Sequence, residues 1–209
     1  VRFVKTHDAY TLTAAGEPLL AGPRGAEGAV AIVRDPRDVA PSLAHHSRIR
    51  VDQAIAMMNN ERAAFCARSD RQYHQLRQQL PSWSGYVASW LDQTDIPVLL
   101  VRYEDMQADA AGQLRRVLEF TQHPADEEAI ARAAAFADFA QLRGQEREKG
   151  FREAPRPHKG GDFFRRGEAG AWLDELTAEQ VARIEAVHAP MMQRLGYALS
   201  ETRPLAQSA

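Results

Sequence analysis

An arginine that follows a run of apolar residues is the clearest candidate in the chain for binding an anion. Residues 31–42 read as an apolar strand, then Arg34, Asp35 and Pro36, then a helix whose first turns carry the hydroxyl of Ser42. A guanidinium at the carboxyl end of a strand and the unpaired N–H groups of the next helix can both bind phosphate. The segment therefore predicts a phosphate site with Arg34 and Ser42, although a turn closed by an internal salt bridge is an alternative.

A second candidate segment, Lys5-Thr6-His7, follows the apolar residues Phe3 and Val4. An imidazole titrates near neutral pH and can accept a proton, and a lysine two residues earlier on a strand would point to the same side. A single histidine at a strand end is, however, more often an ordinary structural residue than a catalytic base. The segment therefore supports a catalytic role only together with other motifs.

Composition indicates one domain and limits the classes of partner. The 209 residues are 44% hydrophobic and 26% charged, which suits a single globular α/β domain over residues 1–209. The net charge of -2 argues against broad binding to nucleic acid. The lone Cys66 excludes an internal disulfide and is expected to be a small buried residue of a helix. No apolar run in this chain is long enough to cross a bilayer, and a single cysteine fits a reducing compartment, so we expect a cytoplasmic protein. A membrane anchor in a missing amino-terminal part stays open.

Short apolar runs alternate with longer helical segments, which is the pattern of an α/β fold. Strands are predicted at 2–6, 29–34 and 97–103, and helices at 37–46, 51–67, 71–79, 83–92, 106–121, 125–137 and 178–195. This order predicts three layers, with a mostly parallel central sheet flanked by helices. Because ligands bind beyond the carboxyl ends of parallel strands, His7, Arg34 and Tyr103 should face one crevice. Residues 144–161 are expected to form a mobile loop, either functional or disordered.

Two more motifs accompany these segments further along the chain. The first is a block made of Ser82-Trp83 with Val87 and Trp90 and of Val101-Arg102-Tyr103-Glu104-Asp105-Met106. The second is Phe164-Arg165-Arg166-Gly167-Glu168-Ala169-Gly170-Ala171-Trp172. In residue types, spacing and order, the four motifs resemble those of sulfotransferases that use 3′-phosphoadenosine 5′-phosphosulfate (PAPS). Each motif alone is weak, but together they extend from Lys5 to about Tyr197, over almost the whole chain.

The resemblance implies a P-loop NTPase-like sulfotransferase fold and a cytoplasmic bacterial enzyme. Its reaction would be the transfer of a sulfonyl group from PAPS, without a metal, to a hydroxyl of a small-molecule acceptor. The resemblance also implies that His7 is the general base and that Lys5 stabilises the transferred group or orients the acceptor. The implied PAPS-binding residues are Arg34, Ser42, Arg165, Arg166 and the Gly167 backbone at the 3′-phosphate, Tyr103 near the adenosine, and Phe139 against the adenine.

Two departures from the family pattern limit these implications. The family's loop for the 5′-phosphosulfate, a Pro-Lys-Ser/Thr-Gly-Thr-Thr turn well before Lys-Thr-His, has no counterpart in this sequence. We therefore expect that the chain lacks an amino-terminal part of the domain and has little transferase activity by itself. In addition, Ala137-Asp138-Phe139 departs from the family's Thr-Ser-Phe, which puts the role of Phe139 in doubt.

Other interpretations stay open at this point. The same type of sheet could serve a P-loop-related kinase, or the chain could be a non-catalytic fragment that retains the 3′-phosphate site. A metal site is not expected, since neighbours such as His45 and His46 point about 100° apart on a helix. Carboxylates such as Glu104 are interpreted as residues of helix starts. The sequence predicts neither the acceptor nor the oligomeric state.

Overall fold

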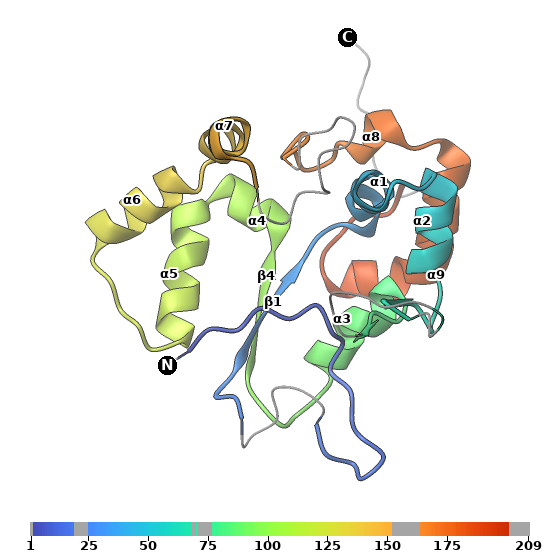
Figure 1. Ribbon diagram of the computed structural model, residues 1–209, viewed down its shortest axis with the longest axis horizontal. Helices are drawn as coiled ribbons and strands as arrows, with labels where there is room; N and C mark the ends of the chain where they lie inside the picture. Colours follow the sequence, from blue (N-terminus) through green and yellow to red (C-terminus); the bar gives the residue numbers. More distant parts are fainter. Residues whose placement is uncertain (1, 19–24, 68–69, 71–76, 152–163, 201–209) are drawn as a thin grey trace.

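Two parallel strands lie between helices at the centre of the molecule (Figure 1). The computed structural model describes residues 2–18, 25–67, 70, 77–151 and 164–200. None of the helices in this part of the chain is long and apolar enough to cross a membrane. In chain order the elements are β1 (Ala29–Val33), α1 (Pro36–Ser47), α2 (Val51–Met58), β2 (Ala64–Phe65), β3 (Gln78–Gln79), α3 (Trp83–Leu91), β4 (Val98–Arg102), α4 (Tyr103–Ala108), α5 (Ala110–Phe120), α6 (Glu127–Phe136), α7 (Phe139–Lys149), α8 (Trp172–Glu175) and α9 (Ala178–Arg194).

The main sheet pairs β1 with β4 in parallel, with Val33 opposite Arg102. Both strands consist almost entirely of aliphatic residues, as expected for strands that helices cover. On one side of the sheet Val33 packs with Val87 of α3 and Met192 of α9. The helix α5 lies on the other side (Figure 1). The predicted α/β architecture, with a parallel sheet flanked by helices, is thus confirmed.

The carboxyl ends of the two strands lie at one edge of the sheet, and each leads directly into a helix. After β1, the side chain of Asp35 caps α1 by accepting a hydrogen bond from the N–H of Arg37 at 2.9 Å, and Pro36 occupies the first turn. After β4, Tyr103 is the first residue of α4. This edge, called the carboxyl edge below, therefore holds both Arg34 and Tyr103.

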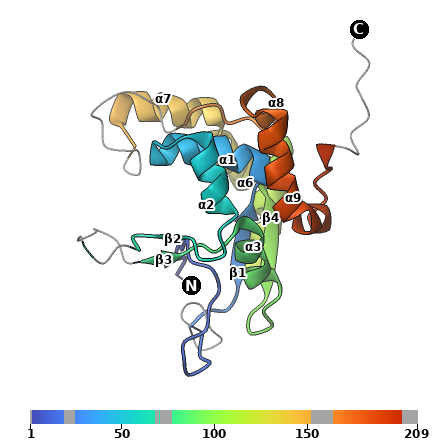
Figure 2. The ribbon, with the colours of Figure 1, turned by 90° about the vertical axis from the view of Figure 1, so that its right-hand side faces the viewer.

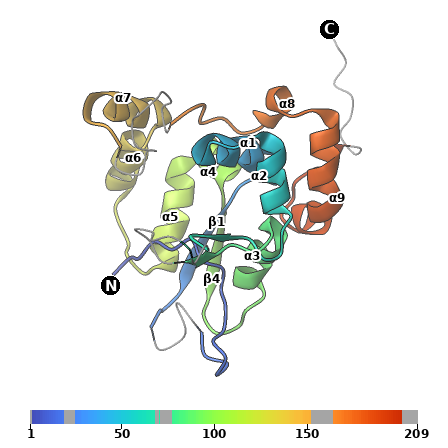
Figure 3. The same ribbon diagram turned by 45° about the vertical axis from the view of Figure 1, so that its right-hand side comes forward.

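The last helix, α9, fixes α1 in place. Thr177 and Gln180 form a capping box at its start, in which each side chain accepts a hydrogen bond from the other residue's backbone N–H. Further along, the fully buried Ile184 packs against Ala40 of α1 and Ile55 of α2. Figure 3 shows α9 standing beside α2. Apolar contacts with α2 and α9 therefore hold α1, which begins at the carboxyl edge, in place.

The strand predicted over 2–6 is wrong, since these residues have no regular secondary structure and are exposed. A strand needs a neighbouring strand to pair its N–H and C=O groups, and the contacts of this segment lie elsewhere. The Phe3 ring meets the His123 ring, with centroids 5.7 Å apart. Three residues after the segment, the N–H of Ala9 donates to the carbonyl of Gln79 at 2.8 Å. The segment is thus tied to β3 and to the residues after α5.

The helix predicted over 51–67 ends early, because α2 stops at Met58. The side chain of Asn60 accepts a hydrogen bond from the N–H of Arg62 at 2.9 Å, and this local turn takes the place of further helical bonds. The chain then enters β2, which pairs with β3 at a distance from the main sheet (Figure 2).

Two neighbouring predictions change with this turn. Cys66 lies in the turn after β2 with a φ of 53° and is only partly buried, so it is not a buried helical residue. The helix predicted over 71–79 is wrong at its end, where Gln78 and Gln79 form β3. Residues 71–76 lie outside the described part of the chain.

Two polar residues set helix boundaries that periodicity did not predict. Asp109 divides the predicted helix 106–121 into α4 and α5, because its carboxylate accepts a hydrogen bond from the N–H of Gly112 at 2.8 Å and caps α5. Asp138 caps α7 in the same way and accepts from the N–H of Ala140 at 2.9 Å. The helix α7 continues to Lys149, so the predicted loop over 144–161 is wrong for its first six residues. Residues 152–163 lie outside the described part.

Candidate functional site

Arg34 and Tyr103 meet at the carboxyl edge of the sheet. The guanidinium carbon of Arg34 lies 4.4 Å from the centre of the Tyr103 ring, which is a cation–π contact. Burial raises the pKa of Tyr103, so its hydroxyl stays protonated at neutral pH. The Nε atom of Arg34 is buried and has no hydrogen-bond partner among the described residues. The strand ends thus present a guanidinium with a donor that can still bind an anion.

Arg37 has a different role from Arg34. Its guanidinium pairs with Asp35 at 2.6 Å and with Glu185 of α9 at 2.7 Å, and it lies 4.2 Å from the centre of the Trp172 ring. Only 5% of its side chain is exposed. The internal salt bridge that the sequence allowed for this turn is therefore formed between Arg37 and Asp35, whereas Arg34 lies 3.8 Å from Asp38.

A second group of arginines reaches the same edge on residues 165–170, called the arginine segment below. Figure 3 shows the chain passing over α1 here on its way to α8. Nη2 of Arg34 donates a hydrogen bond to the carbonyl of Glu168 at 2.6 Å. Arg165 and Arg166 both pair with Glu175, at 2.7 and 3.1 Å, and Arg166 also pairs with the Glu168 carboxylate at 3.1 Å. The three predicted phosphate-binding arginines therefore belong to one connected cluster.

Phe139, at the start of α7, lies directly on Gly167. A Cβ atom at residue 167 would fall 2.2 Å from Cδ2 of the Phe139 ring, and Gly167 has a φ of 67°. The close approach excludes a Cβ atom while the ring stays in place, and the positive φ favours glycine. The Phe139 ring also meets the ring of Phe164 edge to face, with centroids 6.1 Å apart. Two of the predicted nucleotide-binding residues are thus in contact.

Ser42 occupies an exposed position on α1. It follows Asp38 by four residues, so the two side chains lie one turn apart on the same helix face. Asp38 contacts the arginine segment through the N–H of Gly170 at 2.7 Å. Ser42 thus lies one helical turn beyond Asp38 on α1, and its role at the phosphate stays a prediction.

The predicted catalytic residues, Lys5 and His7, lie in the exposed segment at the start of the described chain. The next residue, Asp8, accepts hydrogen bonds from the N–H of Gln79 at 2.8 Å and from the indole N–H of Trp90 at 3.0 Å. These contacts tie the segment to β3 and α3. Within the described residues, the observed contacts join Arg34 to Tyr103 but do not join His7 to either of them. The catalytic roles of His7 and Lys5 stay predictions.

Glu104 holds the two strand ends together, which the sequence did not indicate. Its Oε1 accepts a hydrogen bond from the N–H of Asp35 at 2.9 Å, and its Oε2 accepts one from the hydroxyl of Tyr197 at 2.8 Å. Burial, with the nearby Glu104 charge, raises the pKa of Tyr197, so this hydroxyl keeps its proton. Glu104 does lie in the first turn of α4 as expected. Its partners are far away in the sequence, so no local pattern could have revealed this role.

Asp38 is the second such residue, and its only signal in the sequence was its place in the motif at 34–42. The side chain is almost fully buried, with 2% of the residue exposed. Its two oxygens accept hydrogen bonds from the backbone N–H groups of Gly170 and Trp172, at 2.7 and 2.9 Å. Burial raises the pKa of Asp38, which these two bonds partly offset. The carboxylate thus joins α1 to the arginine segment.

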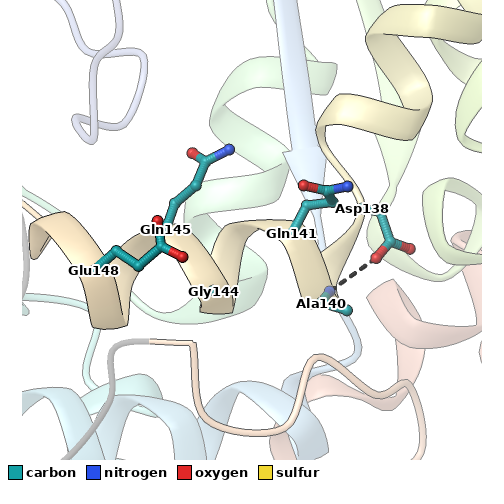
Figure 4. Close-up of a pocket in the computed structure, with 6 residues that line it drawn as sticks. All are labelled: Asp138, Ala140, Gln141, Gly144, Gln145 and Glu148. Atoms are coloured by element: carbon teal, nitrogen blue, oxygen red, sulfur yellow. Dashed lines mark hydrogen bonds between the residues drawn. The ribbon is translucent and has the colours of Figure 1, made fainter.

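A groove of about 380 Å³ runs along α7 (Figure 4). Gln141, Gln145 and Glu148 share one face of the helix, at spacings of four and three residues. The full lining is Asp138, Ala140, Gln141, Gly144, Gln145 and Glu148. Because this lining is neutral or acidic, it does not suit a phosphate, and we separate the groove from the arginine cluster. In the described ranges there is no group of three side chains suited to holding a metal ion.

Comparison with known proteins decides the family of the chain. The sulfotransferase domain family model matches residues 29–196, which include both main strands and the arginine cluster. The chain belongs to the sulfotransferase domain family. The motif Lys5-Thr6-His7 lies before the matched residues.

The curated relatives are sulfotransferases of animals and plants. Sulfotransferase 2B1 of Mus musculus is 26% identical over 175 residues, which cover 80% of this chain and 49% of that protein. Cytosolic sulfotransferase 17 of Arabidopsis thaliana is 27% identical over 186 residues, which cover 83% of this chain and 51% of that protein. The chain thus spans about half the length of these sulfotransferases.

Solved sulfotransferase structures share the fold. Retinol dehydratase in complex with androsterone and the inactive cofactor PAP matches with a TM-score of 0.61 and 22% identity, over 87% of this chain and 51% of that one. Mouse sulfotransferase SULT7A1 complexed with PAP matches with a TM-score of 0.58 and 19% identity, over 83% of this chain and 62% of that one. The predicted sulfotransferase fold is confirmed.

Proposed function

We propose that this sulfotransferase-family protein transfers a sulfonyl group from PAPS to a hydroxyl of a small molecule. The observation that carries the proposal is the arginine cluster at the carboxyl edge, where Arg34 keeps a buried Nε without a described partner. Membership of the family supports the same reaction. Two solved relatives contain PAP, the nucleotide that remains when PAPS has given up its sulfonyl group.

The residues of the cluster fit a phosphate dianion. Arg34, Arg165 and Arg166 offer guanidinium forks, whose geometry matches phosphate oxygens. Gly167 has no side chain, which leaves room for the Phe139 ring, and its backbone N–H is a further donor of this segment. We propose that these four residues and the Ser42 hydroxyl hold the 3′-phosphate of PAPS.

Two aromatic residues border this cluster. Tyr103 lies under Arg34, and Phe139 lies on Gly167. An aromatic ring can stack on a nucleotide base while its other face packs on the protein. We propose that Phe139 contacts the adenine of PAPS and that Tyr103 lies near the adenosine.

The chemical step requires a group that removes the proton of the acceptor hydroxyl. PAPS supplies the activated sulfonyl group when it is bound. We propose that an imidazole nitrogen of His7 accepts the proton, since imidazole is the side chain best suited to proton transfer near neutral pH. We propose that the Lys5 ammonium stabilises negative charge on the transferred group or orients the acceptor.

The acceptor class and the cellular location are proposed at a coarser level. Androsterone and retinol are the small molecules in the complexes of retinol dehydratase. We propose a small-molecule hydroxyl acceptor for this protein as well. The name of the cytosolic relative from Arabidopsis thaliana supports a cytoplasmic location. A bacterial origin stays a prediction from the sequence.

Calorimetric titration of the chain with PAP and with ATP tests the proposal. We expect PAP to bind at one site and at least about tenfold more tightly than ATP, because ATP lacks the 3′-phosphate with which the guanidinium forks are proposed to form charge-assisted bonds. Arg34→Ala should abolish this preference. Arg132→Ala, which removes an exposed arginine of α6 paired with Glu128, should leave it unchanged. Tighter binding of ATP would favour the kinase and contradict the sulfotransferase assignment.

A further inference from the structure

We propose that Asp38 is a positioning residue of the nucleotide site: its carboxylate holds the arginine segment in place over Arg34. The inference rests on the proposed function, because it concerns how the 3′-phosphate site is assembled. Asp38 itself is not proposed to touch the nucleotide.

Both carboxylate oxygens of Asp38 bind the backbone at Gly170 and Trp172, and this pair of hydrogen bonds is called the Asp38 clamp below. Oδ2 accepts from the N–H of Gly170 at 2.7 Å, and Oδ1 accepts from the N–H of Trp172 at 2.9 Å. These partners are 132 and 134 residues away in the sequence. Because both oxygens are used by backbone groups two residues apart, the carboxylate fixes the orientation of the segment as well as its position.

The clamp is connected to the predicted phosphate-binding arginine. Oδ2 of Asp38 lies 3.8 Å from Nη2 of Arg34. The same Nη2 atom donates a hydrogen bond to the carbonyl of Glu168 at 2.6 Å. Asp38, Arg34 and the backbone at 168–170 therefore form a closed set of contacts. A shift of the arginine segment would break all of them together.

The helix that carries Asp38 is itself packed into a buried core. Asp38 lies in the first turn of α1, where the helix dipole favours a negative charge. Two residues later, the fully buried Ala40 packs against Ile184 of α9. A movement of α1 would break these apolar contacts, so α1 is held in place. Through the Asp38 carboxylate, the arginine segment is then held in a fixed position relative to α1.

An electrostatic role and a positioning role of Asp38 predict opposite changes in nucleotide affinity when its charge is removed. A carboxylate 3.8 Å from Arg34 weakens the attraction of the site for a phosphate, so its charge alone would make Asp38→Asn bind the nucleotide more tightly. If Asp38 acts by positioning, Asp38→Asn binds more weakly, because an amide cannot accept from both N–H groups. The sign of the change separates the two roles.

The experiment compares the affinities of the chain for PAP and for AMP, which differ only in the 3′-phosphate, by calorimetry. The variants are Asp38→Asn, Gly170→Ala and their combination. Gly170 has a φ of 82° and nothing within 4 Å of an added Cβ, so alanine strains the backbone without a clash. Each single variant should lower the ratio of PAP to AMP affinity by about tenfold, and the combination by little more, because both disturb the contact between Asp38 and the backbone at residue 170.

Two control variants match these changes elsewhere in the chain. Gly150→Ala introduces alanine at a φ of 70°, again with nothing within 4 Å. Asp126→Asn alters a carboxylate that accepts from the backbone N–H of Ala129 at 2.6 Å at the start of α6. Both should keep the wild-type ratio. A thermal unfolding transition is measured for each variant, to establish that the variant is folded at the temperature of the calorimetry.

An unchanged or higher ratio in Asp38→Asn would overturn the inference. If that variant does not fold, Gly170→Ala decides alone, and an unchanged ratio there overturns it. A wild-type chain that binds PAP no more tightly than AMP would instead contradict the proposed 3′-phosphate site itself. The failure of the clamp and the failure of the proposed function are therefore distinguishable.

Discussion

The ring of Phe139 covers Gly167 so closely that a Cβ atom on residue 167 would fall 2.2 Å from Cδ2 of the ring. This contact joins α7 to the arginine segment. Asp38 in turn joins the same segment to α1, and Arg34 joins it to the end of β1. The residues of the proposed nucleotide site are therefore connected by one continuous set of contacts. A substitution that displaces one of these residues should also displace its neighbours in the set.

Gly167→Ala should lower the affinity for PAP by at least about tenfold. Alanine at a φ of 67° is strained, and its Cβ would force the Phe139 ring away. Calorimetry measures the change. Gly144→Ala, on the same helix as Phe139 and with nothing within 4 Å of an added Cβ, should keep the affinity. Wild-type binding by Gly167→Ala would show that the contact is unimportant for the nucleotide.

Glu168→Gln should increase the affinity for PAP by about threefold. The exposed Glu168 carboxylate pairs with Arg166 at 3.1 Å and competes with a phosphate for that guanidinium. Exposed ion pairs are weak and screened by salt, so the gain should be small and should shrink at high ionic strength. Glu179→Gln, at an exposed position in the first turn of α9, is the control. Weaker binding by Glu168→Gln would show that Glu168 orients Arg166 instead.

Arg37→Ala should lower the free energy of unfolding by about 3 kcal/mol or more, since it leaves two largely buried carboxylates without their partner. These are Asp35 and Glu185, with 8% and 12% of their side chains exposed. Denaturant unfolding measures the loss. Arg132→Ala removes a well-exposed pair with Glu128 and should change the free energy by less than about 1 kcal/mol. Equal effects of the two substitutions would contradict a structural role for Arg37.

His188 should make the protein less stable in mild acid. The residue is fully buried, its Nδ1 bonds to the Ser84 hydroxyl at 2.8 Å, and its Nε2 has no partner among the described residues. Burial lowers the pKa of His188 from 6.5 to about 4. Between these values the unfolded chain binds the proton and the folded chain does not. The free energy of unfolding should therefore fall by about 3 kcal/mol as the pH drops through this range.

Unfolding in denaturant at several pH values between 4 and 7 tests this dependence. In His188→Asn the part of the slope due to this residue should disappear, since asparagine can still bond to Ser84 but does not titrate. His45→Asn, at an exposed position of α1, should keep the wild-type slope. A steep slope that persists in His188→Asn would assign the acid sensitivity to other groups.

His7→Ala should leave the affinity for PAP within about twofold of the wild type, because a general base acts on the acceptor and not on the nucleotide. In the whole protein the same change should lower the rate of sulfonyl transfer by about a hundredfold or more. Transfer assays with a phenol or sterol acceptor measure this rate. Near-normal turnover by His7→Ala would remove His7 from the mechanism.

The elements that sequence predicted well are those with a strong local signal. Aliphatic runs marked β1 and β4, and the motif after β1 placed Arg34 at the carboxyl edge beside Tyr103. The prediction of α9 from its periodicity was also correct to within one residue. Residues 2–6 look like a strand by composition but lack a strand neighbour in the described structure, so composition alone was misleading.

The contacts that assemble the site could not be predicted, because they join distant parts of the chain. Asp38 binds Gly170, and Glu104 binds both Asp35 and Tyr197. Sequence periodicity reports which face of a helix is buried, but it does not say which backbone N–H a buried carboxylate will meet. The residue types at the site were thus predictable, whereas their mutual support was visible only in the fold.

The 3′-phosphate of PAP is the group that the arginine cluster is proposed to bind, and its phosphorus NMR signal reports on it directly. In the complex with the chain, its second pKa should fall by about one pH unit or more, since guanidinium charges favour the dianion. The 5′-phosphate should change less, and Arg34→Ala should restore the value of free PAP. A 3′-phosphate that titrates in the wild-type complex as it does in free PAP would contradict the assignment of this site.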